Sequence, residues 1–299
     1  MIKLTSKKAN KTMNNTIFPC LWFDGNGREA AEFYTTTFNG KITVDTPMVQ
    51  NIELFFFFLM LIDGGSQFQY NASISLMVIC LSETEIDNCW NALSTGGKIL
   101  MPLEKYPFAE KYGWVQDKFG TTWQLIFGDI PENAQRMVPT LMFVNENNGR
   151  AKEAMDFYTQ IFPNSKIEGI LTYKEGGEKE AHPENVQHAE FLIDGYKFGC
   201  MDSSLNHQFN FSGGISLVKL TDNQTETDYL WNSLISDGGN ESMCGWLKDK
   251  FGVSWQIVPK RLLELGIFAD DPIKGQKAFQ AMSKMQKINI QETQNAYNS

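Results

Sequence analysis

The sequence predicts an α+β protein that contains two tandem copies of one domain. Residues 113–126 (GWVQDKFGTTWQLI) return at 245–258 as GWLKDKFGVSWQIV, and eight of these 14 positions are identical. The segment PCLWF at 19–23 returns as PTLMF at 139–143. A chain of 299 residues is long enough for two domains, each with its own hydrophobic core. The repeat therefore indicates a duplication of a unit of about 120 residues.

Each copy divides again into two modules with the same order of elements. In the first copy we expect a strand at 17–23 and then an amphipathic helix in REAAEFYTTTF, followed by two or three strands through about residue 70. The apolar run Leu54–Ile62 is predicted as one buried strand. The pattern restarts with the strand ISLMVICL and the helix ETEIDNCWNALSTGG, and further strands follow around 98–102, 112–117 and 122–127. The order β-α-β-β-β thus occurs four times in the chain.

The repeat also sets the predicted domain boundaries, with PENAQR at 131–136 as the linker. The organisation that we predict is a disordered tail at 1–15, a first domain at 16–130, a second domain at 136–260, and a C-terminal helix and tail at 261–299. Within that last part, helical spacing of Ala278, Met282 and Met285 predicts a helix packed on the second domain. The end, QETQNAYNS, is expected to be frayed.

Composition limits the classes of partner. The net charge of −9 argues against nucleic acid or an anionic membrane as the main partner. The apolar run Leu54–Ile62 is too short for a membrane-spanning helix, which needs about 20 residues. The five cysteines include no C-x-x-C pair, so neither a zinc ribbon nor a disulfide framework is expected. These features predict a cytoplasmic protein.

The longest motifs resemble a known family. PCLWFDGNGREAAEFYTTTF, IDGGSQFQYNASISL, CMDSSLNHQFNFSGGISL and GWLKDKFGVSWQIVP are similar to the PhnB-like branch of the glyoxalase/bleomycin-resistance/dioxygenase fold, the vicinal oxygen chelate superfamily, whose members often carry the domain label 3-demethylubiquinone-9 3-methyltransferase. The resemblance implies that two βαβββ modules form a curved eight-stranded sheet around a cleft. It also implies that the two units pair within the chain as two subunits of a homodimer do, and leaves a further homodimer open.

The resemblance further implies where a divalent metal ion would bind. Metal-binding relatives have a glutamate four residues after the glycine of a D-x-x-G turn, and here those positions are Gln124 and Gln256. A neutral amide is a weaker ligand than a carboxylate for a hard cation. Asp63 and Asp202 are further candidate ligands at the ends of strands, and as turn formers they also fit a purely structural role. A metal cofactor is therefore open but not favoured.

The histidines suggest a second kind of chemistry. His188 and Glu190 alternate in VQHAEFLID, so they share one face of a strand and form a candidate acid/base pair. In the first copy we align them with Asn51 and Glu53. An exposed polar face at a sheet edge is the alternative, and it is slightly favoured on sequence alone.

Aromatic residues supply the candidate ligand-binding surface, because aromatic pockets suit planar or apolar ligands. The candidates, which include one acidic residue of the same strands, are Phe68, Tyr70, Trp114, Phe209, Phe211, Trp246 and Glu53. Core packing is the alternative role for the aromatic members. Trp123 and Gln124 are neighbours on one strand and face opposite sides. Family geometry therefore implies that Gln124 lies in the cleft and that Trp123 packs outward on a helix or a partner sheet.

Three functions remain open from the sequence. The first is a small-molecule enzyme, metal-assisted or using His188 and Glu190, and the second is a metal-free protein that binds or sequesters a small molecule. The third is the methyltransferase of the family label. The loop DGNG lacks the spacing of a glycine-rich nucleotide-binding turn, so the sequence shows no signature of S-adenosylmethionine binding.

Overall fold

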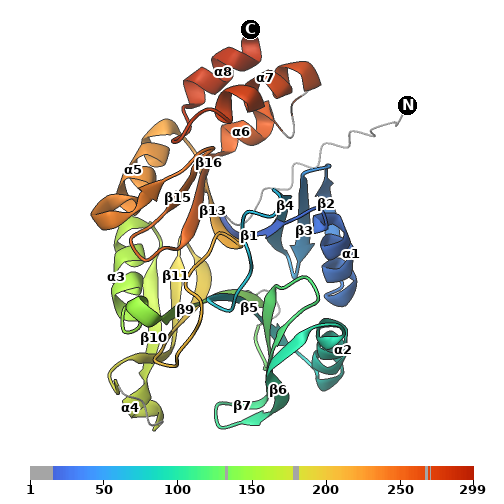
Figure 1. Ribbon diagram of the computed structural model, residues 1–299, viewed down its shortest axis with the longest axis vertical. Coiled ribbons are helices and arrows are strands. Elements are labelled where there is room, and N and C mark those ends of the chain that lie inside the picture. Colours follow the sequence, from blue (N-terminus) through green and yellow to red (C-terminus); the bar gives the residue numbers. More distant parts are fainter. Residues whose placement is uncertain (1–15, 132–133, 178–181, 267–268, 270) are drawn as a thin grey trace.

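Two eight-stranded sheets form the protein in the computed structural model (Figure 1). The structure describes residues 16–131, 134–177, 182–266, 269 and 271–299. The predicted disordered tail at 1–15 lies outside these residues. Among the described helices, none is long and apolar enough to cross a membrane.

Sheet 1 has the strand order β14-β15-β16-β13-β1-β4-β3-β2. Its strands are β1 (Ile17–Phe23), β2 (Lys41–Asp45), β3 (Val49–Leu54), β4 (Phe57–Asp63), β13 (Ile215–Thr221), β14 (Asn240–Glu241), β15 (Trp246–Lys248) and β16 (Ser254–Pro259). Sheet 2 has the order β10-β11-β12-β9-β5-β8-β7-β6. Its strands are β5 (Ile74–Cys80), β6 (Lys98–Tyr106), β7 (Ala109–Gln116), β8 (Thr122–Phe127), β9 (Met137–Val144), β10 (Lys166–Thr172), β11 (Val186–Ile193) and β12 (Tyr196–Ser203).

Each of the four modules has the predicted order β-α-β-β-β. The module helices are α1 (Gly27–Thr37), α2 (Glu83–Ser94), α3 (Ala151–Ile161) and α5 (Gln224–Leu234). Shorter elements are α4 (Tyr173–Gly176) and the 3-10 turns at Asn145–Asn147 and Ser236–Gly238. In every module the first strand lies parallel to the last, as β1 does to β4. The fold is therefore the predicted α+β arrangement of four βαβββ modules.

The sheets do not coincide with the sequence copies. The first module, β1 to β4, joins the fourth through antiparallel pairing of β1 with β13. The second and third modules join through antiparallel pairing of β5 with β9. Each sheet thus takes one module from each copy, so the copies are interlocked within one chain.

The aspartate of the repeated motif D-K-F-G is a buried hydrogen-bond acceptor that connects the two sheets. The Asp117 carboxylate accepts hydrogen bonds from the Tyr34 hydroxyl (2.8 Å) and the Trp123 indole (2.8 Å). Tyr34 lies on α1 of the sheet 1 module, whereas Asp117 and Trp123 belong to the sheet 2 module. Trp123 is fully buried and packs on the ring of Phe38, so it faces the helices as the family geometry implied.

The second copy has the same hydrogen bonds at its own aspartate. Asp249 accepts from the Tyr158 hydroxyl (2.7 Å) and the Trp255 indole (2.9 Å). Both aspartates also accept two backbone N–H groups of their own turns. These shared buried hydrogen bonds explain why the motifs at 113–126 and 245–258 are so similar in sequence, and no catalytic role is needed to explain it.

The apolar run Leu54–Ile62 is not one strand, contrary to the prediction. Leu54 ends β3 and Phe57 begins β4, and a tight turn at Phe55 and Phe56 joins them. Both turn residues have positive φ, 54° and 70°, as a type I′ hairpin requires. Phenylalanine rarely adopts this conformation, so residue type gave no indication of the turn.

The C-terminal part is more ordered than predicted. After β16 come α6 (Lys260–Leu265), α7 (Pro272–Met282) and α8 (Ile290–Asn298), stacked at the sheet 1 end of the molecule (Figure 1). The segment expected to fray is α8, and its Asn289 side chain caps the helix by accepting from the Glu292 backbone N–H (3.1 Å). Capping and packing against α7 explain why this polar segment is helical.

Candidate functional site

Each sheet turns one face toward the helices and leaves the other face concave. In sheet 2, Ser75 pairs with Thr140 and Met77 with Gln124, so these four side chains share a face. The alternate residues Leu76 and Trp123 belong to the main core under the helices. We call the concave face of sheet 2 cleft 2 and that of sheet 1 cleft 1.

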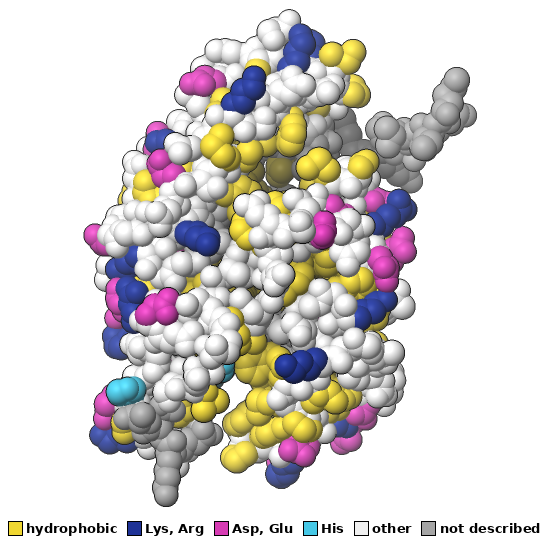
Figure 2. Space-filling view, in the orientation of Figure 1, with side chains coloured by type: hydrophobic (Ala, Val, Ile, Leu, Met, Phe, Trp, Pro, Cys, Tyr) yellow, Lys and Arg dark blue, Asp and Glu magenta, His cyan; other side chains and the backbone are white. Residues whose placement is uncertain are grey.

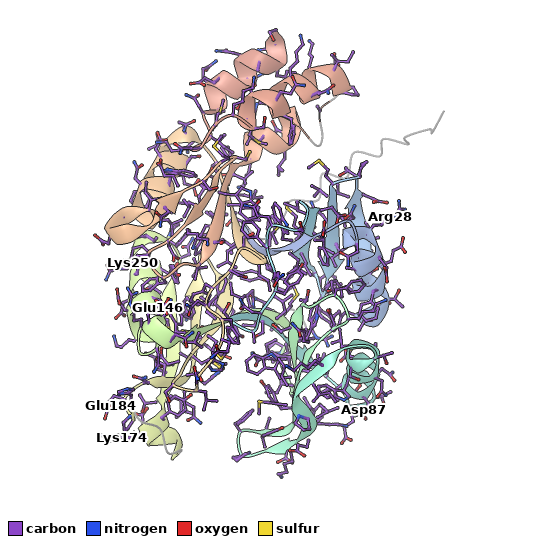
Figure 3. All side chains as sticks on the ribbon, viewed as in Figure 1. Arg28, Asp87, Glu146, Lys174, Glu184 and Lys250 are labelled. Atoms are coloured by element: carbon purple, nitrogen blue, oxygen red, sulfur yellow. The ribbon has the colours of Figure 1, made fainter. Side chains whose placement is uncertain are left out.

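Cleft 2 opens between two lobes at the lower end of the molecule. Figure 2 shows the opening between the lobe of β6 and β7, where hydrophobic side chains gather, and the lobe of β10 and α4. Lys174 and Glu184 pair at 3.0 Å on the α4 lobe, and Asp87 on α2 lies on the outer side of the other lobe (Figure 3). The wall on the side of β6 and β7 is therefore apolar, and the wall on the side of β10 and α4 adjoins charged surface residues.

A closed network of neutral groups forms the floor of cleft 2. The Gln124 amide oxygen accepts from the Tyr112 hydroxyl (2.7 Å), and its nitrogen donates to the Ser75 hydroxyl (2.7 Å). All three side chains are buried, and burial raises the pKa of Tyr112, which keeps it protonated. The amide has both its ends bonded to protein.

Cleft 1 has the same amide at the same position. Gln256 donates to the Ser216 hydroxyl (3.0 Å), and Cys20 from β1 lies beside both. Burial raises the pKa of the Cys20 thiol to about 12, although bonds with Gln256 and Ser216 oppose the shift. Cys20 is therefore a thiol at neutral pH, and a thiol is a poor metal ligand.

The two candidate aspartates lie apart from the amides. Asp202 is paired with Phe143 of the helix-facing core, on the face opposite to that of Gln124. Its carboxylate accepts three backbone N–H groups, from Gly149 (2.8 Å), Ala151 (3.1 Å) and Val186 (2.9 Å). In the first copy Asp63 accepts from the Gly27 N–H (2.9 Å) at the start of α1. These aspartates hold the beginnings of α1 and α3.

The donor set does not fit a divalent cation. No group of three or more His, Cys, Asp or Glu side chains that could hold a metal ion occurs within the described residues. The amides at the family ligand positions are bonded to serine, and they share their faces with hydroxyl, thiol and apolar groups. A hard cation needs charged oxygen ligands, which these floors lack.

His188 and Glu190 lie on the polar wall of cleft 2. Glu190 pairs with Gly199, whose neighbour across the sheet is Thr140 of the cleft floor. Glu190 binds Lys197 (2.7 Å), which also binds Glu168 (3.0 Å). The His188 imidazole makes no hydrogen bond to any other residue that the structure describes. Burial lowers the pKa of His188, against the opposing effect of Glu190, so the ring is neutral at pH 7.

Hairpin geometry corrects the predicted alignment of these residues between the copies. The turn Phe55–Phe56 corresponds to Asp194–Gly195, since both are two-residue turns with positive φ. Counting back from the turns, the counterpart of Glu190 is Asn51 and that of His188 is Val49. The sequence alignment with Glu53 and Asn51 was shifted by two residues, which alternation on a strand does not reveal because the face is preserved.

Of the predicted aromatic residues, Trp114 lies in cleft 2, and Trp246 and Phe68 lie in cleft 1. Trp114 pairs with Gln124, and its buried indole N–H has no partner among the described residues. Trp246 pairs with Gln256 and packs edge-on against Trp22 (5.6 Å between ring centres), which also contacts Phe68 (5.0 Å). These three predicted residues do stand beside the amides.

The other four candidates have different places. Tyr70 and Phe211 pack on the core rings Phe23 and Phe143 rather than on a cleft floor. Phe209 lies in the loop after β12, against His207 (5.0 Å). Glu53 lies at the cleft 1 edge and forms an ion pair with Lys41 (3.2 Å). The side chain of His207 is itself bonded to Ser203 (2.8 Å). Core packing therefore accounts for Tyr70 and Phe211, two of the four candidates.

Tyr112 and Lys197 are residues of cleft 2 that were absent from the sequence candidates. Tyr112 stands two residues before Trp114, so its shared face could have been found by alternation. Its ring also joins Tyr106 and Phe108 at 5.6 and 5.1 Å, which extends the aromatic wall. Nothing in the sequence indicated that Lys197 lies in the cleft, because its place there depends on ion pairs with Glu168 of β10 and Glu190 of β11.

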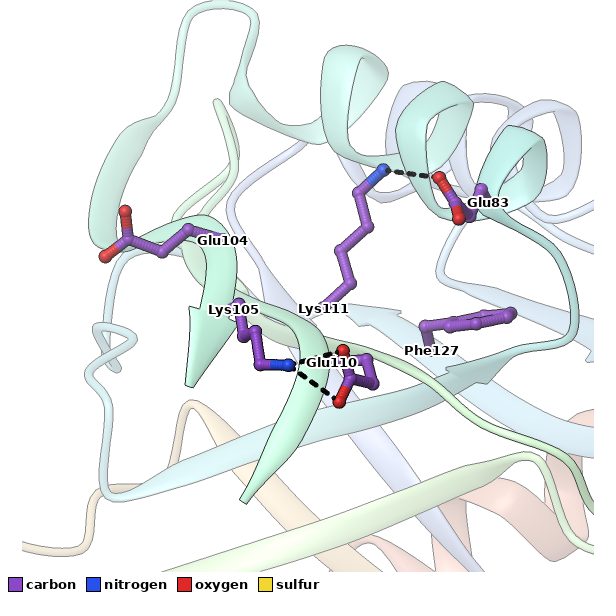
Figure 4. A pocket seen from close by; sticks show the side chains of 6 residues that line it. All are labelled: Glu83, Glu104, Lys105, Glu110, Lys111 and Phe127. Carbon is purple, nitrogen blue, oxygen red and sulfur yellow. Dashed lines mark hydrogen bonds and ion pairs between the residues drawn. The ribbon is translucent and has the colours of Figure 1, made fainter. Parts of the chain in front are cut away.

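A pocket of about 440 Å³ lies elsewhere, between α2 and the β6–β7 hairpin (Figure 4). Its lining residues are Glu83, Glu104, Lys105, Glu110, Lys111 and Phe127. Lys105 binds Glu110 (2.8 Å), and Lys111 binds Asp87 (2.6 Å). The two lysines are already paired and the pocket is on the helix side of the sheet, so cleft 2 is the stronger candidate.

The sequence of both copies matches a known protein family. A family model described as 3-demethylubiquinone-9 3-methyltransferase matches residues 15–126 and again 135–258. A solved Bacillus cereus structure titled as a 3-demethylubiquinone-9 3-methyltransferase, PhnB protein, is 35% identical over 36% of this chain and 96% of its own, with a TM-score of 0.35. No curated protein matches the chain.

Glyoxalase I from Zea mays shares the fold across most of the chain. Its structure is 13% identical, covers 81% of this chain and 93% of its own, and has a TM-score of 0.52. The structure of a point mutant of the same Zea mays enzyme gives 14% identity, coverage of 81% and 92%, and a TM-score of 0.53. At this identity the likeness establishes the glyoxalase fold alone.

Proposed function

The chain belongs to the 3-demethylubiquinone-9 3-methyltransferase family, and from this premise we propose that it binds a small planar molecule in cleft 2 without a metal ion. The observation that carries the proposal is the closed network of Gln124. Its oxygen and nitrogen are both bonded to protein at 2.7 Å, at the position where the family geometry would place a metal ligand. Binding must then use the walls of the cleft.

The walls offer complementary chemistry for an aromatic ligand with oxygen groups. Trp114, Tyr112, Tyr106 and Phe108 provide flat apolar surface. The unpartnered Trp114 N–H can donate to a hydroxyl or carbonyl oxygen. The neutral His188 imidazole can accept a hydrogen bond from a hydroxyl group. We therefore propose an uncharged planar molecule with hydroxyl or carbonyl groups as the ligand class.

His188 also supports acid/base catalysis as a second candidate function. A neutral imidazole at neutral pH can take a proton from a bound hydroxyl, and Glu190 favours the charged ring that results. Glu190 is bonded to Lys197 (2.7 Å), so it acts on His188 through its charge rather than through a hydrogen bond. Methyl transfer is not proposed, because the loop DGNG lacks the spacing of a glycine-rich turn that would bind S-adenosylmethionine.

Binding of 2,6-dihydroxynaphthalene, followed by quenching of tryptophan fluorescence, tests the proposal. We expect His188→Ala to weaken binding about tenfold, which is the effect of one good hydrogen bond. The dimethoxy analogue cannot donate, so the same variant should change its affinity less than about twofold. His182→Ala, at an exposed position, is the matched control. Equal binding of the dihydroxy probe by wild type and His188→Ala contradicts the proposed site.

A further inference from the structure

The two clefts use the same strand positions but different side chains. Cleft 2 has Lys197 on its polar wall, and the corresponding position in cleft 1 is Phe58, one residue after the start of β4. At the positions of His188 and Glu190, cleft 1 has Val49 and Asn51. His188, Glu190 and Lys197 of the cleft 2 wall are thus replaced by uncharged residues in cleft 1.

The floor and walls of cleft 1 form a separate apolar cluster. Phe18, Cys20, Met60, Val218 and Leu220 are its buried members. Half-buried apolar side chains surround them, namely Val49, Phe58, Ile62, Val258 and Leu263. Figure 2 shows hydrophobic side chains around a hollow below the C-terminal helices, at the sheet 1 end. Cleft 1 therefore presents a hollow apolar surface.

One polar group in this surface lacks a partner. The side-chain oxygen of Asn51 is buried and bonds to none of the described residues. Asn51 pairs with Met60 of the apolar cluster, so it shares the concave face. A buried acceptor without a donor is unfavourable, and a bound N–H or O–H group would satisfy it.

The charged side chains on the cleft 1 face lie toward its rim. Lys41 and Glu53 pair with one another at one edge (3.2 Å), and Lys248 on β15 is exposed. The floor groups Ser216 and Gln256 are bonded together, and Cys20 is a neutral thiol. A charged ligand would lose its hydration and find no opposite charge on the described floor, so the cleft disfavours ions.

We propose that cleft 1 is a second binding site, and that it takes an uncharged apolar molecule with one hydrogen-bond donor, which the Asn51 side chain accepts. This proposal is independent of cleft 2. It assigns the two halves of the duplicated chain to ligands of different polarity.

N-phenyl-1-naphthylamine is a suitable probe, because it is neutral and apolar, carries one N–H donor, and becomes fluorescent in apolar surroundings. We expect saturable binding to the full chain, and Phe58→Lys should weaken it more than about tenfold, since it adds a charge that the bound probe would have to desolvate. Lys occupies the equivalent position 197 of cleft 2, so the fold accepts it there. Lys197→Met is the matched control and should alter the affinity less than about twofold.

The hydrogen bond is tested separately with Asn51→Ala. This variant should bind the probe about fivefold more weakly, the effect of one net hydrogen bond. The N-methylated probe has no donor, so its affinity should be the same in wild type and Asn51→Ala. Thermal unfolding verifies that each variant is folded, and if Phe58→Lys is not, Asn51→Ala decides the matter.

Three results would overturn the proposal. They are the absence of saturable probe binding, an affinity unchanged in folded Phe58→Lys or in Asn51→Ala, and a loss of binding in Lys197→Met. The last result would place the probe in cleft 2. Because 2,6-dihydroxynaphthalene binding depends on His188, failure at either cleft is distinguishable from failure at the other.

Discussion

The Tyr112 hydroxyl donates a hydrogen bond to the amide oxygen of Gln124, so this oxygen is already bonded within the protein. We predict that Tyr112→Phe lowers the free energy of unfolding by about 1–2 kcal/mol, since it leaves a buried acceptor unpaired. Urea denaturation measures this change. In the control Tyr106→Phe the lost bond is exposed, to the Pro102 carbonyl, and the cost should stay below about 0.5 kcal/mol. Equal costs in the two variants would contradict a closed network.

His188 makes stability depend on pH in a defined direction. Burial lowers its pKa in the folded state below the ordinary value of 6.5, so on acidification the unfolded chain takes up the proton first. The free energy of unfolding should therefore fall as the pH drops below 6.5 toward the folded-state pKa. Burial lowers the pKa of His207 as well, so the effect has two sources.

We predict that His188→Gln reduces this pH dependence and leaves the part due to His207. Urea denaturation between about pH 5 and about pH 8 covers the range. His182→Gln, at an exposed position, is the matched control for the substitution itself. A slope in His188→Gln equal to that of wild type would show that His188 is not buried in the folded protein.

Residue identity predicted part of the site. The family's D-x-x-G spacing singled out Gln124 and Gln256, which lie on strands whose alternation fixes the face of each side chain. It did not reveal the Tyr112 bond, nor that Asp63 and Asp202 hold helix starts. Those facts depend on contacts between distant segments, such as the bond from the Val186 N–H to Asp202.

Among the elements, the β3–β4 hairpin has a turn that its sequence does not favour. Phe55 and Phe56 both adopt positive φ, whereas the equivalent turn of the second copy is Asp194–Gly195, which suits a type I′ turn. Arg136 lies over the Phe55 ring at 4.1 Å and so stabilises that residue. Phe56 is 69% exposed and gains little from packing.

We predict that Phe56→Gly raises the free energy of unfolding by about 1 kcal/mol. Glycine removes the cost of positive φ, and this exceeds the entropy that it adds to the unfolded chain. Thermal or urea unfolding measures the change. Gly195→Phe is the reciprocal control and should destabilise by a similar or larger amount. Destabilisation by Phe56→Gly would contradict the strained turn.

Most elements followed from local pattern, and the exceptions have physical causes. The module helices and the alternation of His188 and Glu190 in β11 were predicted from periodicity. The Phe55–Phe56 turn was not, because no glycine, asparagine or aspartate indicates it. Helix α8 was not either, because its stability comes from a cap and from packing on α7 rather than from an apolar stripe.

For the whole molecule, the important feature is the interlocking of the two copies. Each sheet crosses from one copy to the other, through five residue pairs between β1 and β13 and five between β5 and β9. The repeat predicted the duplication, but it could not fix which modules share a sheet. The repeated order of elements is compatible with pairing inside a copy or between copies.

We predict that a chain cut between the copies stays assembled. A protease site inserted after Asp129, followed by cleavage, should give two fragments that elute together at the size of the intact chain. They should separate only in denaturant, because unpairing β1 from β13 and β5 from β9 exposes the apolar strand faces of both sheets. Separate elution under native conditions would mean that each copy is a self-contained unit.

Elemental mass spectrometry shows whether the clefts of the chain bind a metal ion. The protein is incubated with excess manganese, nickel, zinc or iron, desalted and analysed, with Gln124→Ala and Gln256→Ala in parallel. We expect far less than one metal ion per chain in all three proteins, because the amides are bonded to protein and the cleft floors lack charged oxygen ligands. Near-stoichiometric metal in wild type that is lost in either variant would contradict it and would make that amide a metal ligand.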